Sequence, residues 1–96
     1  MHCFFSPLAE FDLEEIGDYI ASDNPRRAVS FVQELRDLCL KMMTSPEAFP
    51  LRRDLGENIR MCPFHSYLIF YTVNAEELRI ERILHGARDI PRFFDA

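Results

Sequence analysis

The stretch SYLIFYTVNAEELRIERIL, residues 66–84, decides the fold class, because it holds two β-rich runs separated by only three residues. The gap NAE, 74–76, is short enough for a hairpin turn. The first run is apolar almost throughout, which is typical of a central strand covered on both faces. A third run, IRMC at 59–62, precedes it across the short gap PFH. We therefore expect three strands in an antiparallel meander.

Two amphipathic helices are predicted ahead of this meander. A short strand, HCFF at 2–5, ends at Ser6, which can cap a helix that takes Pro7 in its first turn. The apolar face of this helix repeats at helical spacing, as Leu13, Ile16 and Ile20. Asn24 and Pro25 repeat the pattern of cap and first position. The second helix has the strongest periodic signal, an apolar stripe of Ala28, Phe31, Val32, Leu35, Leu38, Cys39 and Met42.

These elements predict an α+β fold with the order β-α-α-β-β-β, in which an antiparallel sheet packs against an N-terminal helical hairpin. The stretch SPEAFPLRRDLGEN, 45–58, contains two prolines and a glycine and is predicted to be the connecting loop. The chain has 96 residues, 48% of them hydrophobic and 28% charged. That composition suits one hydrophobic core, so we expect a single domain, 1–96.

Composition also narrows the class of function. No apolar run approaches the ~20 residues of a membrane span, and the N-terminus lacks the pattern of a signal peptide, so we expect a cytoplasmic protein without a membrane partner. The three cysteines are far apart and form no C-x-x-C pair, so no disulfide, metal site or cofactor is expected.

The charge distribution argues against strong direct binding to nucleic acid. Net charge is 11 − 16 = −5, and the first 25 residues contain six acids and no Lys or Arg. Affinity for a phosphate backbone depends on clustered Lys and Arg, and here the later arginines are interleaved with acids. This charge distribution is still compatible with a local basic patch.

Four segments together resemble the ParE-type toxins of the RelE/ParE superfamily. They are DLEEIGDYI at 12–20, the long second helix, YLIFYTV at 67–73 and IERILHGARD at 80–89. The resemblance implies a RelE-like fold and the toxin of a type II toxin–antitoxin module, a class linked to plasmid stabilisation. It also implies a ParD-like antitoxin that lays a helix and an extended tail across the toxin. ParE-type toxins are associated with inhibition of DNA gyrase, whereas RelE-type relatives cut messenger RNA on the ribosome.

The two activities make different chemical demands. RNA cleavage needs a base, cations for the phosphate and an acid for the leaving oxygen. By resemblance, Arg60 and Arg88 match two basic positions of the nucleases, but Tyr67 stands at the third-strand arginine and Phe94 at the C-terminal tyrosine. A phenyl ring can neither donate nor accept a proton. His85 can substitute as acid or base.

The nuclease hypothesis therefore rests on Arg60, His85 and Arg88, and each has a structural alternative. His85 is favoured as a strand-end histidine hydrogen-bonded to a neighbouring loop, and Arg60 as a solvated strand residue. Arg82 shares strand parity with three apolar residues, Leu78, Ile80 and Leu84. It can contact a partner or pair with an acid such as Glu14 or Asp18.

The resemblance assigns antitoxin binding to the first helix and one strand arginine, as Leu13, Ile16, Tyr19, Ile20 and Arg82. The acidic face of that helix is otherwise an ordinary solvated face. For Tyr19, Tyr67 and Tyr71, core packing is the favoured role.

The tail RDIPRFF, 88–94, has two interpretations. It can be a flap that buries its phenylalanines against the sheet, or it can leave the sheet after Gly86 and display an aromatic and basic docking surface. The resemblance favours display, with target binding by Arg88, Ile90, Arg92, Phe93 and Phe94. We expect a toxin that binds DNA gyrase without chemistry of its own. The alternatives are a RelE-type ribosome-dependent RNase and a diverged toxin that only binds its antitoxin.

Overall fold

The computed structural model describes residues 1–94, so the last two residues of the expected 1–96 domain lie outside the described part. The regular elements are β1 (His2–Phe5), α1 (Pro7–Ala21), α2 (Pro25–Lys41), β2 (Arg60–Phe64), β3 (Tyr67–Val73) and β4 (Glu77–His85). Two 3-10 turns, η1 (Met42–Thr44) and η2 (Ile90–Phe93), complete them. This order confirms the α+β class and the β-α-α-β-β-β prediction. No helix in the described residues is long and apolar enough to cross a bilayer.

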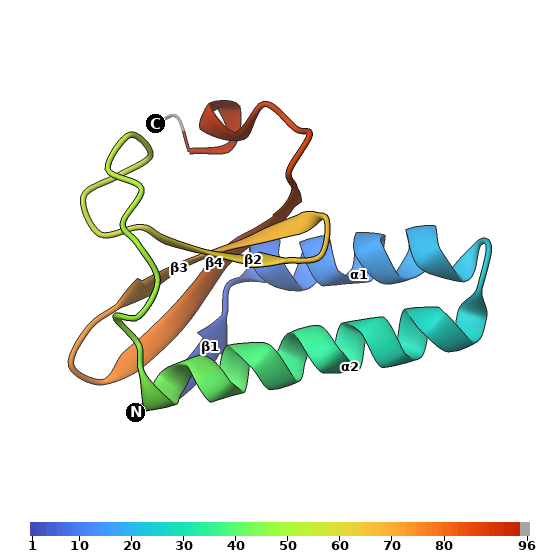
Figure 1. Cartoon of the computed structure of the whole chain (residues 1–96), viewed down its shortest axis with the longest axis horizontal. Coiled ribbons are helices and arrows are strands. Elements are labelled where there is room, and N and C mark those ends of the chain that lie inside the picture. Colours follow the sequence, from blue (N-terminus) through green and yellow to red (C-terminus); the bar gives the residue numbers. More distant parts are fainter. Residues whose placement is uncertain (95–96) are drawn as a thin grey trace.

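Both helices begin at the predicted caps. The Ser6 hydroxyl oxygen accepts a hydrogen bond from the Ala9 N–H at 3.0 Å, and Pro7 occupies the first turn, where its missing N–H costs nothing. The Asn24 side chain accepts from the Arg27 N–H at 3.1 Å in the same way. The two helices run antiparallel and cover one face of the sheet (Figure 1).

The sheet has the strand order β1-β4-β3-β2. Strands β2, β3 and β4 form the predicted antiparallel meander, but β1 pairs with β4 in parallel, so the sheet is mixed and not antiparallel throughout. β4 is the last strand of the meander, and β1 pairs with the edge of β4 that the meander leaves open. The connection from β1 to that edge includes the whole helical hairpin, and a crossover of that kind can return the chain in the parallel direction.

The turn between β2 and β3 is shorter than predicted. β2 continues through Pro63 to Phe64, and His65 makes the turn with φ 52°, a left-handed conformation. The Met61 N–H points away from the sheet and donates to the Pro50 carbonyl at 3.1 Å. Strand alternation places Pro63 on that same outer edge, where a missing N–H breaks no ladder bond.

Side chains of the central strand are buried on both faces, as its apolar run predicts. Ile69 and Tyr71 belong to the main core beneath the helices, whereas Phe70 packs on the opposite face with Leu55, Leu84 and Ile90. Ile69, Phe70 and Tyr71 are each 0% exposed. The C-terminal segment covers this second face (Figure 1).

A β-bulge in β4 changes which way its side chains point. Tyr71 pairs with Ile80 and the preceding Phe70 pairs with Arg82, so Glu81 is an extra residue in the strand. Beyond the bulge the alternation is reversed. The expectation that Arg82 shares a face with Ile80 is therefore wrong, and Arg82 lies on the second face with Leu84.

Candidate protein-interaction site

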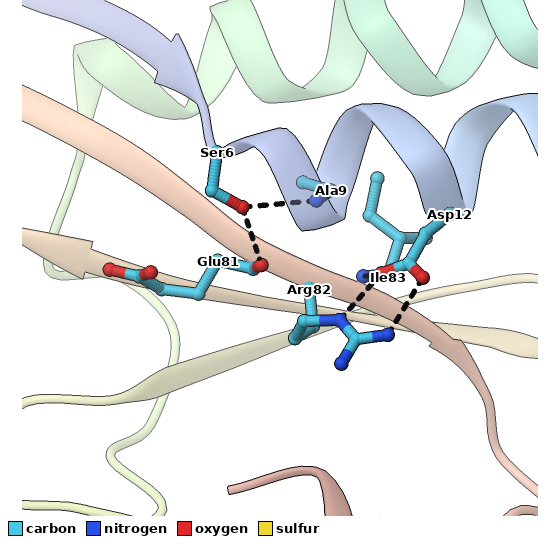
Figure 2. Close-up of polar contacts among 6 residues, drawn as sticks. All are labelled: Ser6, Ala9, Asp12, Glu81, Arg82 and Ile83. Atoms are coloured by element: carbon cyan, nitrogen blue, oxygen red, sulfur yellow. Dashed lines mark hydrogen bonds and ion pairs between the residues drawn. The ribbon is translucent and has the colours of Figure 1, made fainter.

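The edge of β4 is longer than its partner β1, and α1 covers the difference. β1 ends where Phe5 pairs with Ile80, and the next residue, Ser6, donates its N–H to the Ile80 carbonyl at 2.9 Å. The Ser6 hydroxyl then donates to the Glu81 carbonyl at 2.7 Å (Figure 2). Ser6 thus caps α1 and also fastens the helix to the bulge.

Less than two helical turns further on, Asp12 takes the place of a strand partner. Its carboxylate accepts from the Ile83 N–H at 2.9 Å and from two nitrogens of Arg82, each at 2.9 Å (Figure 2). Asp12 is only 5% exposed. The hydrogen bonds to Asp12 raise the pKa of Arg82 above its usual value. An ion pair buried this well is fixed in position, because the bidentate geometry satisfies both charges.

Arg82 pairs with an acid, as one alternative predicted, but that acid is Asp12. The two acids named in the prediction were Glu14 and Asp18. Asp12 lies on the buried side of α1 with Ala9 and its helical neighbours, whereas Glu14 and Asp18 are exposed.

A groove of about 750 Å³ runs between α1 and the C-terminal half of β4. Its lining includes Ile16, Tyr19, Ile20 and Arg82, four of the five residues expected to contact an antitoxin. The fifth, Leu13, packs in the main core and is only 2% exposed.

Tyr19 departs from its predicted role in the core. Its side chain is 76% exposed at the rim of the groove, because α1 turns this position away from the sheet. Tyr71 does pack in the core, where its hydroxyl donates to the Pro46 carbonyl at 3.0 Å. Tyr67 packs against the core and contacts the ring of His85, with 5.3 Å between ring centroids.

The tail is a flap and not a displayed peptide. Ile90 is 7% exposed, and Phe94 packs edge-on against Phe70 with 5.0 Å between ring centroids. The ring of Phe93 contacts two guanidinium groups, those of Arg82 at 5.0 Å and Arg88 at 4.8 Å. The expected display of Ile90, Phe93 and Phe94 is thus wrong for this conformation, because the apolar second face needs a cover. Arg88 and Arg92 are exposed.

Of the three residues of the nuclease hypothesis, His85 and Arg88 line the same groove, but Arg60 does not meet them. Arg60 pairs with Tyr71 and His85 pairs with Tyr67, so four residues of β3, about 13 Å, separate their positions along the sheet. Arg60 donates to the carbonyls of Glu47 and Phe49, at 3.2 and 2.7 Å, so it holds the connecting loop and is not merely solvated.

The His85 imidazole accepts from the Ala87 N–H at 3.1 Å, which is the loop contact favoured for it. No cluster of His, Cys, Asp and Glu suited to a metal ion occurs within residues 1–94.

Sequence reasoning missed a second hollow, between the outer faces of α1 and α2. Phe11 and Val29 line it and are 53% and 74% exposed. The sequence signal for this hollow was one apolar residue on each helix outside its apolar stripe, Phe11 on α1 and Val29 on α2. Gly17 lies at this helix crossing, near Val32.

Comparison with known proteins adds two findings. The family model described as "ParE toxin of type II toxin-antitoxin system, parDE" matches residues 3–90. A solved structure described as the chromosomal ParDE TA system from P. aeruginosa aligns with a TM-score of 0.77 at 19% identity. The alignment covers 88% of this chain and 95% of that chain, and at this identity it shows the fold. No curated protein matches the chain.

Proposed function

Because the chain belongs to the ParE toxin family of type II toxin–antitoxin systems, we propose that it acts by binding DNA gyrase and is neutralised by a ParD-like antitoxin. Toxin and target are then both cytoplasmic, and no cofactor takes part. The gyrase assignment rests on the family association, and the mode of action, binding without chemistry, rests on the site.

The observation that carries a binding function is the composition of the groove between α1 and β4. From α1, exposed Tyr19 lines the groove with Ile16 and Ile20, and Phe93 and the arginines at 82 and 88 line it from the β4 side. Aromatic side chains and arginines around an apolar centre are the residues that anchor protein interfaces. We assign antitoxin binding to this groove. We assign target binding to the tail residues Arg88, Ile90, Arg92, Phe93 and Phe94 in a state in which the tail has left the sheet, since Ile90 and Phe94 are packed when it is closed.

RNA cleavage has weaker support. Arg60 is occupied by two loop carbonyls, His85 lies about 13 Å along the sheet from it, and Phe94 supplies no proton. A general acid and a phosphate-binding cation must meet at one phosphate to contribute to catalysis. The separation favours binding over chemistry.

The test is a supercoiling assay with purified gyrase beside a translation reaction probed for messenger cleavage. Each is run with the toxin alone and with the toxin bound to the antitoxin with which it is co-expressed. Loss of supercoiling with intact messenger, relieved by the antitoxin, is the expected result. Cut messenger with normal supercoiling would overturn the proposal and identify a ribosome-dependent RNase. Inactivity in both assays, with tight antitoxin binding, would identify a diverged toxin.

A further inference from the structure

The tail is held to the sheet by side chains only. Within the described residues, the backbone hydrogen bonds of segment 87–94 are local. The Arg88 N–H donates to the His85 carbonyl, the Arg92 N–H to that of Asp89 and the Phe94 N–H to that of Pro91, at 3.0 to 3.2 Å. A strand would instead be joined to its neighbour by a ladder of backbone hydrogen bonds, and a core helix would have a long run of them. Segments with few such bonds open at low free energy.

Arg82 connects this tail to α1. The edge of its guanidinium donates to Asp12, and the guanidinium carbon lies over the Phe93 ring, 5.0 Å from the ring centroid. A planar guanidinium can make both contacts at once, because hydrogen bonding uses its edge and stacking uses its face. Asp12 fixes the angle of that plane, so the helix sets the surface on which Phe93 rests.

The same residues form a wall of the groove. Arg82, Arg88 and Phe93 line it from the β4 side, and Phe11, Glu15 and Tyr19 line it from the α1 side. The groove has this wall only while the tail is closed. Since a ligand stabilises whichever state it binds better, a segment that uses the closed wall must stabilise the closed tail.

We propose that Arg82 couples the groove to the tail, so that an antitoxin segment in the groove keeps Phe93 and Phe94 closed against the sheet. This inference rests on the proposed function, in which the tail contacts the target. The antitoxin then neutralises the toxin without covering the tail. A segment bound in the groove keeps the target-binding residues packed on the sheet, where the target does not reach them.

Hydrogen exchange of the Phe94 amide in the full chain reports the order of the tail turn, which the packing of Phe94 on Phe70 holds against the sheet. Arg82→Lys keeps the charge but loses the planar stack and the bidentate pair, so we expect protection of this amide to fall about fivefold. Arg79→Lys is the matched control. Arg79 lies on the same strand and lines a hollow with Phe93 and Phe94, but it donates to Glu81 and stacks on Phe4 at 4.9 Å, not on a tail ring. It should leave Phe94 protection unchanged.

Addition of the co-expressed antitoxin should raise Phe94 protection in the wild-type chain by more than in the Arg82→Lys chain. An equal rise in both would overturn the coupling, because it would mean that the antitoxin covers the tail directly. A fall in protection would also overturn it, since the antitoxin would then release the tail. The amides of Ile69 and Tyr71 in β3 report whether each variant is folded.

Should Arg82→Lys not fold, Phe93→Leu removes the stack from the tail side, with Phe4→Leu as its control. An unchanged Phe94 protection factor in Phe93→Leu would refute the proposed coupling between Arg82 and the tail. None of these measurements uses gyrase, so a failed supercoiling assay and a failed coupling are separate results.

Discussion

The carboxylate of Asp12 accepts three hydrogen bonds, two from Arg82 and one from the Ile83 N–H. It therefore satisfies a buried cation and an edge amide of β4 that has no neighbouring strand. A carboxylate this well buried is stable only while both partners are present. Asp12 is the residue at which helix, sheet and tail depend on one another.

Replacement of Asp12 by Asn tests this dependence. The amide keeps the shape but loses the charge, and its NH2 group would face a donor, so we expect the free energy of unfolding to fall by about 2–4 kcal/mol. Urea denaturation measures the change. Glu10→Gln is the control, because Glu10 pairs with Arg36 at the exposed surface and such pairs contribute about 0–1 kcal/mol. Equal losses in the two variants would contradict the structural role of Asp12.

Asp12 was not identified from the sequence, although Arg82 was. The strand pattern showed that Arg82 emerges from an apolar row and needs either a partner or an acid. It did not show the bulge at Glu81, which changes the face on which Arg82 lies. A bulge adds one residue to one strand, and period-two patterns in a single strand have no sign that marks it. The choice among Asp12, Glu14 and Asp18 depends on that unseen geometry.

At the level of elements, α1 contains a weak point at Gly17. A Cβ built there would lie 3.5 Å from Val32, which is ordinary van der Waals contact. Since glycine in a helix interior is less stable than alanine, Gly17→Ala should raise the free energy of unfolding by about 0.5–1 kcal/mol. Thermal unfolding measures it. Gly56→Ala serves for comparison, because its Cβ would meet Ile59 at 2.8 Å and should give no gain. A less stable Gly17→Ala protein would show that the helices cannot accommodate the methyl group.

The helices were more predictable than the loops between strands. Ser6-Pro7 and Asn24-Pro25 mark both helix starts, because cap and first-turn chemistry is local. The turn at His65 was predicted too early, since β2 continues through Pro63 to Phe64. Whether proline ends a strand depends on which edge it faces, and that is a property of the assembled sheet.

The tail is the element whose role the sequence left undecided. Removal of residues 92–96 deletes Phe93 and Phe94 and uncovers Phe70, which is 0% exposed in the intact chain. We expect the truncated protein to remain folded but to lose about 2–4 kcal/mol of stability, since two partly buried aromatic side chains are lost. Toxicity should disappear, and antitoxin affinity should weaken by the loss of Phe93 from the groove wall. Arg92→Ala, which changes an exposed side chain only, should stay as stable as wild type. A truncated chain that unfolds would make the tail core and would exclude its role in docking.

At the scale of the whole molecule, the α+β class and element order followed from the pattern, but the division of the sheet into two covered faces did not. The helical hairpin covers one face, and the flap with Leu55 covers the other. The sequence shows apolar residues on both sides of β3, and it does not show which distant segment covers each side. Phe93 and Phe94 were therefore equally compatible with a flap and with a displayed peptide.

The same arrangement separates the binding hypothesis from the nuclease hypothesis. His85 lies at the end of β4 that meets the groove, where it pairs with Tyr67 at the start of β3. Arg60, on β2, pairs with Tyr71, four residues further along β3. His85→Ala should therefore leave toxicity within about twofold of wild type, since Arg60, the strand cation of the nuclease hypothesis, lies about 13 Å from it along the sheet. Growth after induction of the toxin, with and without its antitoxin, measures the effect. Phe93→Ala is the comparison and should reduce toxicity strongly, because it removes a proposed target contact. If His85→Ala abolished toxicity and Phe93→Ala left it intact, the chain would act by chemistry, and the groove end of β4 would be its active site.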